Sequence, residues 1–463
     1  MILPRLIIAD EHRPGKVPAG VMMAAVLKEM GYRLKLFLGN IDEPSMRILQ
    51  VMCGQPVTLL DPLLCGGKAN LRWLFQSAAS PDCINLVIMS LGGRWSEDSA
   101  FRIPKECLLM AEYLECEVIP IFYSDTSSTI TIRTVTDVIK QFENSVGDVI
   151  HSVLFRSILN YREYELVDRE VGRQTSAISL GSISRSMERE SPPIADLCSG
   201  SAAQAILPVR SAAVQIKSSE HMIQWGLFSA LAQNCPEWKP QPRLGEPISD
   251  AGKVNVAVVR SPALTLGGDG TEHLMRMLGC NVVEVPLEGG LYQNVPIHGV
   301  YVPHGLTFLV IQMFFDNAYL RTMLTRGSSG SSFFLVEGGS APILGDRIVM
   351  PPGFDNSETR GFSVMPYDSV YRAMNMGTPR RVFASGRKAN PLLRGSQEFV
   401  GGYISNNLAI ASPDPEDECW NLRESPQANV FGSDAWCKGR ALVTRMRIEP
   451  WSAPESFRRW LEG

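Results

Sequence analysis

Two residue types that build metal and thiol sites are thinly spread in this sequence. Its six histidines end at His304, and its ten cysteines include no pair spaced as CxxC. Zinc and iron–sulfur sites commonly draw on such pairs, so these classes of metalloprotein have weak support. Scattered thiols without a paired framework are typical of a reducing cytosol, which predicts a cytoplasmic protein whose cysteines are mostly small buried residues.

Long apolar runs and a strong net charge are also missing. No stretch approaches the roughly 20 apolar residues that cross a bilayer. A net charge of -4 gives no basis for nucleic acid or an anionic membrane as the main partner. The chain has 463 residues, of which 45% are hydrophobic and 20% charged, as expected for a globular protein of two or three domains.

Short apolar runs alternate with helical patterns in the first half of the chain. This alternation predicts a mostly parallel sheet with helices on both faces, an α/β domain over residues 1–234. A stretch rich in proline and charge, 235–253, is interpreted as a linker. A second α/β domain is predicted over 254–463. The expected strands are 7–8, 34–38, 86–89, 118–122, 149–155, 254–259, 282–285, 299–302 and 333–336.

A partial phosphate-binding pattern follows the first predicted strand. Gly15 and Lys16 stand where the GxxxxGK[ST] loop has its glycine and lysine, which would make them nucleotide-binding residues. Asp10, however, occupies the leading glycine position and would repel phosphate, while Val17 replaces the hydroxyl that holds magnesium. The pattern leaves two interpretations, a working nucleotide site or a relic turn that opens a helix, and it favours the second.

Five segments in chain order carry a resemblance to the cobyrinic acid a,c-diamide synthase family. GVYVPHG is similar to the family's glycine–leucine–tyrosine–leucine–proline–glycine–glycine, and EGGS to its glutamate–cysteine–glycine–glycine. Each motif alone is weak, and the ordered set is specific. The segments are 36–64, 86–95, 299–305, 337–340 and 394–399.

The resemblance implies a fold and a chemistry. A P-loop amination domain like that of dethiobiotin synthetase would be followed by a class I glutaminase-like, flavodoxin-like α/β domain. Such enzymes use ATP and magnesium to activate carboxylates of a tetrapyrrole precursor, and they draw ammonia from glutamine. The expected partners are therefore that tetrapyrrole precursor or a partner subunit, and a bound tetrapyrrole is an expected cofactor. A homodimer is one of the assemblies that would fit.

The sequence departs from the family at the residues that carry the reaction. Gly338 occupies the position of the nucleophilic cysteine, and no cysteine lies between Cys280 and Cys419. The family's late histidine pair is matched by Arg445 and Arg447, and no histidine follows His304. Since the thiolate needs an imidazole to activate it, glutamine hydrolysis is predicted to be absent.

The amination half offers only candidates for metal or substrate contact. Ser90 stands where the family has an acidic residue, which Glu97 or Asp98 could replace if the turn is longer. Asp42 could contact metal or substrate, or it could cap the helix expected near Pro44, and capping is favoured.

Three basic residues are candidates for ligand recognition. Arg445 and Arg447, two apart in a predicted strand, could clamp carboxylates, although a solvated strand face or a pair of structural salt bridges is the favoured interpretation. His304, in a loop, could ligate a metal or a metallated tetrapyrrole, or be merely polar.

Two main functions follow. The first is a catalytically degenerate family member that keeps binding of a tetrapyrrole precursor, a nucleotide or a partner protein. The second is an ATP-dependent amide ligase that uses free ammonia or another amine. Its magnesium–phosphate site would have to be rebuilt by Lys16, Asp42, Glu97 and Asp98. A scaffold that binds no small molecule is a third and weaker hypothesis.

Overall fold

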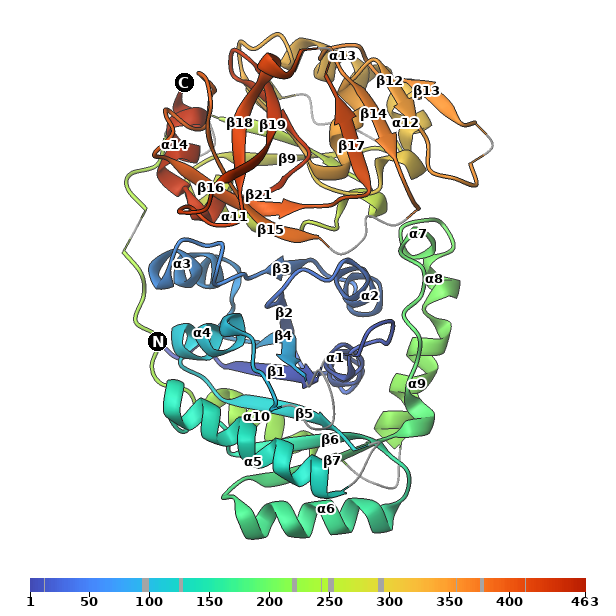
Figure 1. The fold of residues 1–463 in the computed structure, drawn as a ribbon, viewed down its shortest axis with the longest axis vertical. Helices are drawn as coiled ribbons and strands as arrows, with labels where there is room; N and C mark the ends of the chain where they lie inside the picture. Colours follow the sequence, from blue (N-terminus) through green and yellow to red (C-terminus); the bar gives the residue numbers. More distant parts are fainter. Residues whose placement is uncertain are drawn as a thin grey trace. The chain divides into compact units, whose positions relative to one another are not determined.

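The chain folds into two compact units. The computed structural model describes residues 1–11, 13–93, 100–124, 128–218, 223–242, 244–248, 254–289, 295–354, 356–374, 379–412 and 414–463. The N-terminal unit comprises 1–63, 71–193 and 201–241, and the C-terminal unit comprises 64–70, 194–200 and 242–463. Figure 1 shows both units.

A seven-stranded sheet forms the core of the N-terminal unit. Its order is β3-β2-β4-β1-β5-β6-β7, and every neighbouring pair is parallel. The parallel α/β sheet predicted from the apolar runs is therefore confirmed. The strands are β1 (Arg5–Glu11), β2 (Leu34–Leu38), β3 (Val57–Leu59), β4 (Ile84–Gly92), β5 (Val118–Tyr123), β6 (Ser152–Ile158) and β7 (Ile178–Ser184).

Helices cover both faces of this sheet. In Figure 1, α1 and α2 lie on one side of the strands and α3 and α4 on the other. Helix α1 packs tightly because its first nine residues are all buried, and a Cβ on Gly20 would lie 3.0 Å from Ile8 and Ile88. The main helices of the first half are α1 (Ala19–Glu29), α2 (Glu43–Cys53), α3 (Lys68–Ala78), α4 (Lys105–Leu114), α5 (Ser128–Ser145), α6 (Tyr161–Gln174), α9 (Leu207–Ser218) and α10 (Trp225–Gln233).

The C-terminal unit holds a mixed ten-stranded sheet in the order β21-β16-β15-β18-β19-β20-β11-β10-β8-β9. From β20 to β9 the neighbours are parallel, and from β21 to β20 they are antiparallel. The strands are β8 (Asn255–Arg260), β9 (Asn281–Pro286), β10 (Gly299–Val302), β11 (Phe333–Glu337), β15 (Arg380–Gly386), β16 (Phe399–Ile404), β18 (Glu418–Arg423), β19 (Val430–Lys438), β20 (Ala441–Thr444) and β21 (Arg447–Glu449).

Smaller elements complete this unit. A four-stranded sheet has the order β13-β12-β14-β17. Its strands are β12 (Arg347–Val349), β13 (Glu358–Arg360), β14 (Asp368–Tyr371) and β17 (Leu408–Ala411). The helices are α11 (Gly270–Met277), α12 (Ile311–Asp316), α13 (Ala318–Gly327) and α14 (Pro454–Glu462).

The stretch interpreted as a linker, 235–253, begins as an ordered part of the N-terminal unit. Trp238 is fully buried there, with its ring 5.1 Å from that of Phe75 and the Arg72 guanidinium 3.8 Å from its centre. Residues 249–253 lie outside the described part of the chain. Burial of the Trp238 ring therefore holds the first third of the stretch 235–253 against the N-terminal unit.

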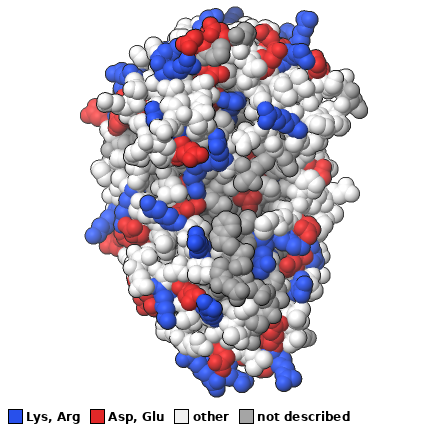
Figure 2. All heavy atoms as spheres, in the orientation of Figure 1, with Lys and Arg blue, Asp and Glu red and all other residues white. Residues whose placement is uncertain are grey.

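The face of the molecule drawn in Figure 2 carries both signs of charge. On the face drawn in Figure 2, Lys and Arg side chains are interspersed with Asp and Glu. Among the described helices, none combines the length and the apolar character that crossing a membrane requires.

A histidine at the amino-terminal edge of the first sheet makes stability depend on pH. His151 Nδ1 lies 2.7 Å from Glu117 Oε2, and this hydrogen bond raises the pKa of His151 above 6.5, against a smaller opposing effect of burial. Because the folded state then binds the proton more tightly, the contribution is complete below pH 6.5 and is lost as pH rises through the raised pKa. Because His151 is half-exposed, we expect its pairing with Glu117 to contribute less than about 1 kcal/mol to the free energy of unfolding.

Urea unfolding of the wild type and of His151→Gln at several pH values on either side of 6.5 checks this expectation. The glutamine keeps an N–H donor for Glu117 and cannot titrate, so its stability curve should be flatter in this range. Parallel curves for the two proteins would contradict the assignment.

Candidate functional site

The turn after β11 has the geometry on which α/β enzymes present a nucleophile. The chain leaves β11 at Glu337, passes through Gly338 with φ of +62°, and enters a 3-10 helix, Gly338–Leu344. A sharp strand-to-helix turn of this kind exposes one side chain at the end of the sheet. Here that residue is Gly338, which has no side chain to present.

The ring of His304 fills the space beside this glycine. A Cβ built on Gly338 would lie 2.0 Å from His304 Nδ1, and the Gly339 N–H donates to the same Nδ1 over 3.0 Å. His304 is only 4% exposed. In a nucleophile turn, the N–H that follows the nucleophile stabilises the oxyanion. In this chain, the Gly339 N–H instead donates to the imidazole of His304. Because Nδ1 accepts this hydrogen bond, the ring proton must lie on Nε2.

The sequence places His304 there through two neighbouring parallel strands. β10 pairs with β11 in register, Val302 opposite Val336, so the residues that follow both strands meet at one edge of the sheet. Gly305 lets the loop pass, since a Cβ on it would lie 1.9 Å from the Ala263 carbonyl oxygen. The ring of His304 is buried and its Nδ1 is engaged, and its role as a metal or tetrapyrrole ligand stays a prediction.

The buried carboxylate of Glu337 holds the end of β11, directly before the turn. Glu337 Oε1 accepts from the Tyr301 hydroxyl at 2.6 Å, and Oε2 accepts from the Ile448 N–H at 2.8 Å. Burial raises the pKa of Glu337, and the nearby Arg447 and these hydrogen bonds oppose that rise. Both oxygens therefore fix the end of β11 against its neighbours.

The predicted carboxylate clamp of Arg445 and Arg447 is not formed. Arg447 is buried, donating to Glu449 at 2.9 Å and to the Gly267 carbonyl at 2.7 Å. Arg445 lies outside β21 and donates to Asp434 at 3.0 Å. The two arginines do not share a strand face, and each is paired with a carboxylate of the chain itself. Structural salt bridges, part of the favoured interpretation, describe both.

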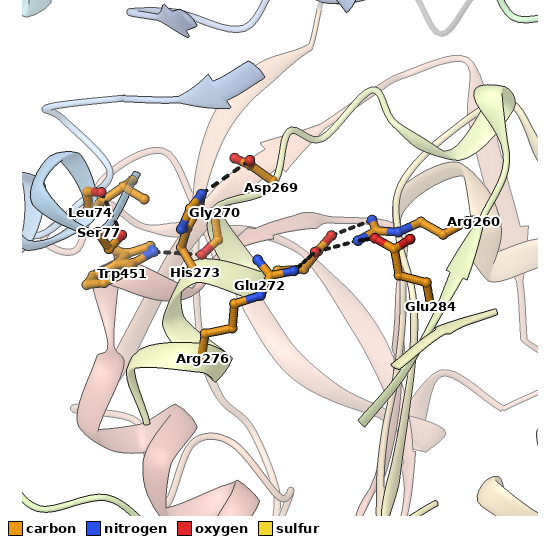
Figure 3. A network of polar contacts seen from close by, with 10 residues as sticks. All are labelled: Leu74, Ser77, Arg260, Asp269, Gly270, Glu272, His273, Arg276, Glu284 and Trp451. Atoms are coloured by element: carbon orange, nitrogen blue, oxygen red, sulfur yellow. Dashed lines mark hydrogen bonds and ion pairs between the residues drawn. The ribbon is translucent and has the colours of Figure 1, made fainter. Parts of the chain in front are cut away.

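A second charge network fixes α11 (Figure 3). Arg260 donates to both oxygens of Glu272 at 2.5 Å and to Glu284 at 3.1 Å, and Arg276 donates to Glu272 at 3.1 Å. Burial disfavours the charge, but Glu272 and Glu284 outweigh it and raise the pKa of Arg260. The network joins α11 to β8 and β9. The Arg260 guanidinium is therefore bound by carboxylates of the chain itself.

At the phosphate-loop position of the N-terminal unit, a carboxylate stands where phosphate would bind. Asp10 Oδ2 accepts from the Ala19 N–H, the first of α1, at 2.6 Å, and from Arg156 Nη1 at 2.6 Å. Helix N-termini attract anions, and this one holds a side chain of the chain itself. Burial raises the pKa of Asp10, while Arg156 opposes the rise.

The loop of Gly15 and Lys16 is tied down by a neighbouring segment. The Val17 N–H donates to the Arg189 carbonyl at 3.0 Å, and the Lys16 N–H donates within the loop at 3.3 Å. The Lys16 ammonium pairs with Glu190 at 2.5 Å. Two loop amides and the lysine that a nucleotide would need are thus engaged by protein atoms.

The remaining candidates do not assemble a metal site within the described ranges. Asp42 accepts from the Ser45 N–H and hydroxyl at the start of α2, as the capping interpretation expects. Glu97 and Asp98 lie outside the described residues. In the part of the chain that the structure describes, no three His, Cys, Asp or Glu side chains gather as metal ligands do.

Comparison with known proteins finds similarity in structure alone. No protein-family model and no curated protein matches the sequence. A glutamine amidotransferase from Thermotoga maritima is 12% identical, with 45% of this chain and 81% of that chain covered and a TM-score of 0.30. PurLQS from the same organism is 11% identical, with 45% and 98% covered and a TM-score of 0.31. Chloroplast FtsY from Physcomitrella patens is 11% identical, with 39% and 59% covered and a TM-score of 0.28. At these scores the neighbours carry no argument about what this chain does.

Proposed function

We propose that this chain is an amidotransferase-like protein that has lost catalysis and acts by binding. The observation that carries the proposal is the imidazole of His304 at Gly338. It fills the space for a nucleophile and accepts the Gly339 N–H that would stabilise an oxyanion. The space in which a nucleophilic side chain would stand is thus taken by the protein's own ring.

The phosphate-loop position supports the same proposal independently. Asp10 neutralises the amino end of α1, and its buried partner Arg156 is held by that charge. A phosphate group would have to displace a carboxylate that is covalently part of the chain. The free-ammonia ligase, which needs ATP at Lys16, is therefore the less favoured function.

The family resemblance suggests what is bound. We propose a tetrapyrrole precursor or a partner subunit of a tetrapyrrole-modifying assembly as the ligand. An absorption spectrum of the protein purified from its native host tests the first choice, because a bound tetrapyrrole absorbs visible light. A colourless protein that co-purifies with a second chain would favour the subunit.

Loss of catalysis is tested with glutamine and with ATP, the two small substrates of a glutamine-dependent ligase. We expect no glutamate release from glutamine and no magnesium-dependent heat of ATP binding by titration calorimetry. Phosphate alone should not bind at the Gly15–Lys16 loop, since the Lys16 and Val17 N–H groups already donate to carbonyl oxygens of the chain. Glutamate release above that of heat-denatured protein, or saturable ATP binding that needs magnesium, would contradict the proposal.

A further inference from the structure

Two cysteines lie close together on adjacent strands of the C-terminal unit. In the antiparallel pair β18–β19, Glu418 lies opposite Trp436 and Trp420 opposite Asp434. Cys419 and Cys437 each follow a member of the first pair, which places them diagonally across the two strands. Diagonal neighbours on one face lie within reach of each other's side chains.

Both cysteines also touch the same short segment. The Arg387 N–H donates to the Cys419 carbonyl at 2.9 Å, and the Cys437 thiol lies 3.5 Å from the Ala389 carbonyl oxygen. This common neighbour places the two residues side by side.

The two thiols have different surroundings. Cys419 is fully buried, while Cys437 is only partly covered. The neighbouring Cys419 thiol, together with the smaller effect of the Lys388 charge, lowers the pKa of Cys437 against the opposing effect of burial. The Cys437 thiol and burial raise the pKa of Cys419, as does the nearby Asp434. A partly exposed thiol of lowered pKa, beside a second thiol, is the arrangement of oxidation-sensitive cysteines.

We infer that Cys437 and Cys419 form an oxidation site, in which Cys437 reacts first with hydrogen peroxide and Cys419 closes a disulfide. The Cys437 thiolate attacks one peroxide oxygen, the O–O bond breaks, and hydroxide leaves, so that sulfur is oxidised and peroxide reduced. The Cys419 sulfur then attacks the sulfenic sulfur, the S–O bond breaks, and the hydroxyl leaves as water with the Cys419 proton.

The bond should be easily reversed. Diagonal cysteines on paired strands have Cα atoms about 7–8 Å apart, beyond the usual disulfide range, so the strands must approach slightly. A strained disulfide is reduced more readily than a relaxed one. The modification is therefore suited to a reversible response to peroxide rather than to permanent cross-linking.

Trypsin gives a direct readout on the full chain. It cuts after Arg423, between the two residues, so each of them falls in a separate peptide with no other cysteine. After treatment with hydrogen peroxide, mass spectrometry should find these two peptides joined, and dithiothreitol should separate them. Cys83, partly covered like Cys437, serves as an internal control and should stay reduced under the same treatment.

Two variants separate the roles. In Cys419→Ala, Cys437 should still react, and its sulfenic acid should accumulate as a dimedone adduct at least several-fold above wild type. In Cys437→Ser, neither the adduct nor the joined peptides should form. Wild-type protein in which Cys437 oxidises without the cross-link, or reacts no faster than Cys83, would overturn the inference, and this readout does not depend on whether a variant folds.

Discussion

Replacing Gly338 with alanine is expected to lower the free energy of unfolding by about 2–5 kcal/mol. A left-handed backbone costs a non-glycine residue about 1–2 kcal/mol, and overpacking a filled site costs about 1–3 kcal/mol. Both apply here, because φ is +62° and the new methyl group would lie 2.0 Å from His304 Nδ1. Thermal or urea unfolding of the two proteins measures the difference.

Gly54 supplies a matched control for the backbone cost. Its φ is +63°, and a methyl group added to it would meet no atom within 4 Å. Gly54→Ala should therefore cost about 1–2 kcal/mol, and the excess at Gly338 measures the clash with His304. In a double-mutant cycle, adding His304→Ala to Gly338→Ala should recover part of that excess. Equal losses at both glycines would mean that the ring does not occupy the space.

Gly338→Cys tests the chemical side of the same contact. The thiol would meet the His304 ring and lack an oxyanion donor, since the Gly339 N–H is already engaged. We expect no glutamate release from glutamine by this variant. Measurable hydrolysis would show that His304 moves aside and acts as the base.

Neutralising Asp10 is expected to be the other large loss, about 3 kcal/mol for Asp10→Asn. Breaking one side of a buried ion pair leaves the partner's charge uncompensated, which typically costs about 3–5 kcal/mol. Among the carboxylates of the described residues, Arg156 would keep Glu188, at 3.6 Å. In Asp10→Asn, an amide nitrogen would stand at one of the two oxygen positions; Oδ1 has no hydrogen-bond partner among the described residues. Urea unfolding followed by circular dichroism measures the loss.

An exposed pair of the same length is the control. Arg173 and Glu170 also lie 2.6 Å apart, on the surface of α6. Arg173→Ala should change stability by less than about 1 kcal/mol. If the two substitutions cost the same, burial of the Asp10–Arg156 pair would not be the cause of its contribution.

Local pattern was sufficient for several features of this protein. Continuous apolar runs predicted five of the seven parallel strands of the first sheet, because a strand covered on both faces needs apolar residues at every position. The strands β3 and β7 were not predicted. Asp42 could be interpreted as a helix cap, since capping joins residues three apart. The absence of a cysteine near Gly338 and of any histidine after His304 is likewise visible without a structure.

Contacts between distant segments were decided only by the tertiary structure. Asp10 and Arg156 are 146 residues apart, and His304 meets Gly339 across 35. No periodicity marks such pairs, because they form where separate strands end at one edge of a sheet. Arg447 shows the same limit, because its burial and its pairing with Glu449 depend on the tertiary structure and its spacing from Arg445 did not reveal them. Sequence thus determined most strands of the first sheet and the missing nucleophile. Packing determined what fills the space beside Gly338, because electrostatic and steric contacts depend on which strand ends meet.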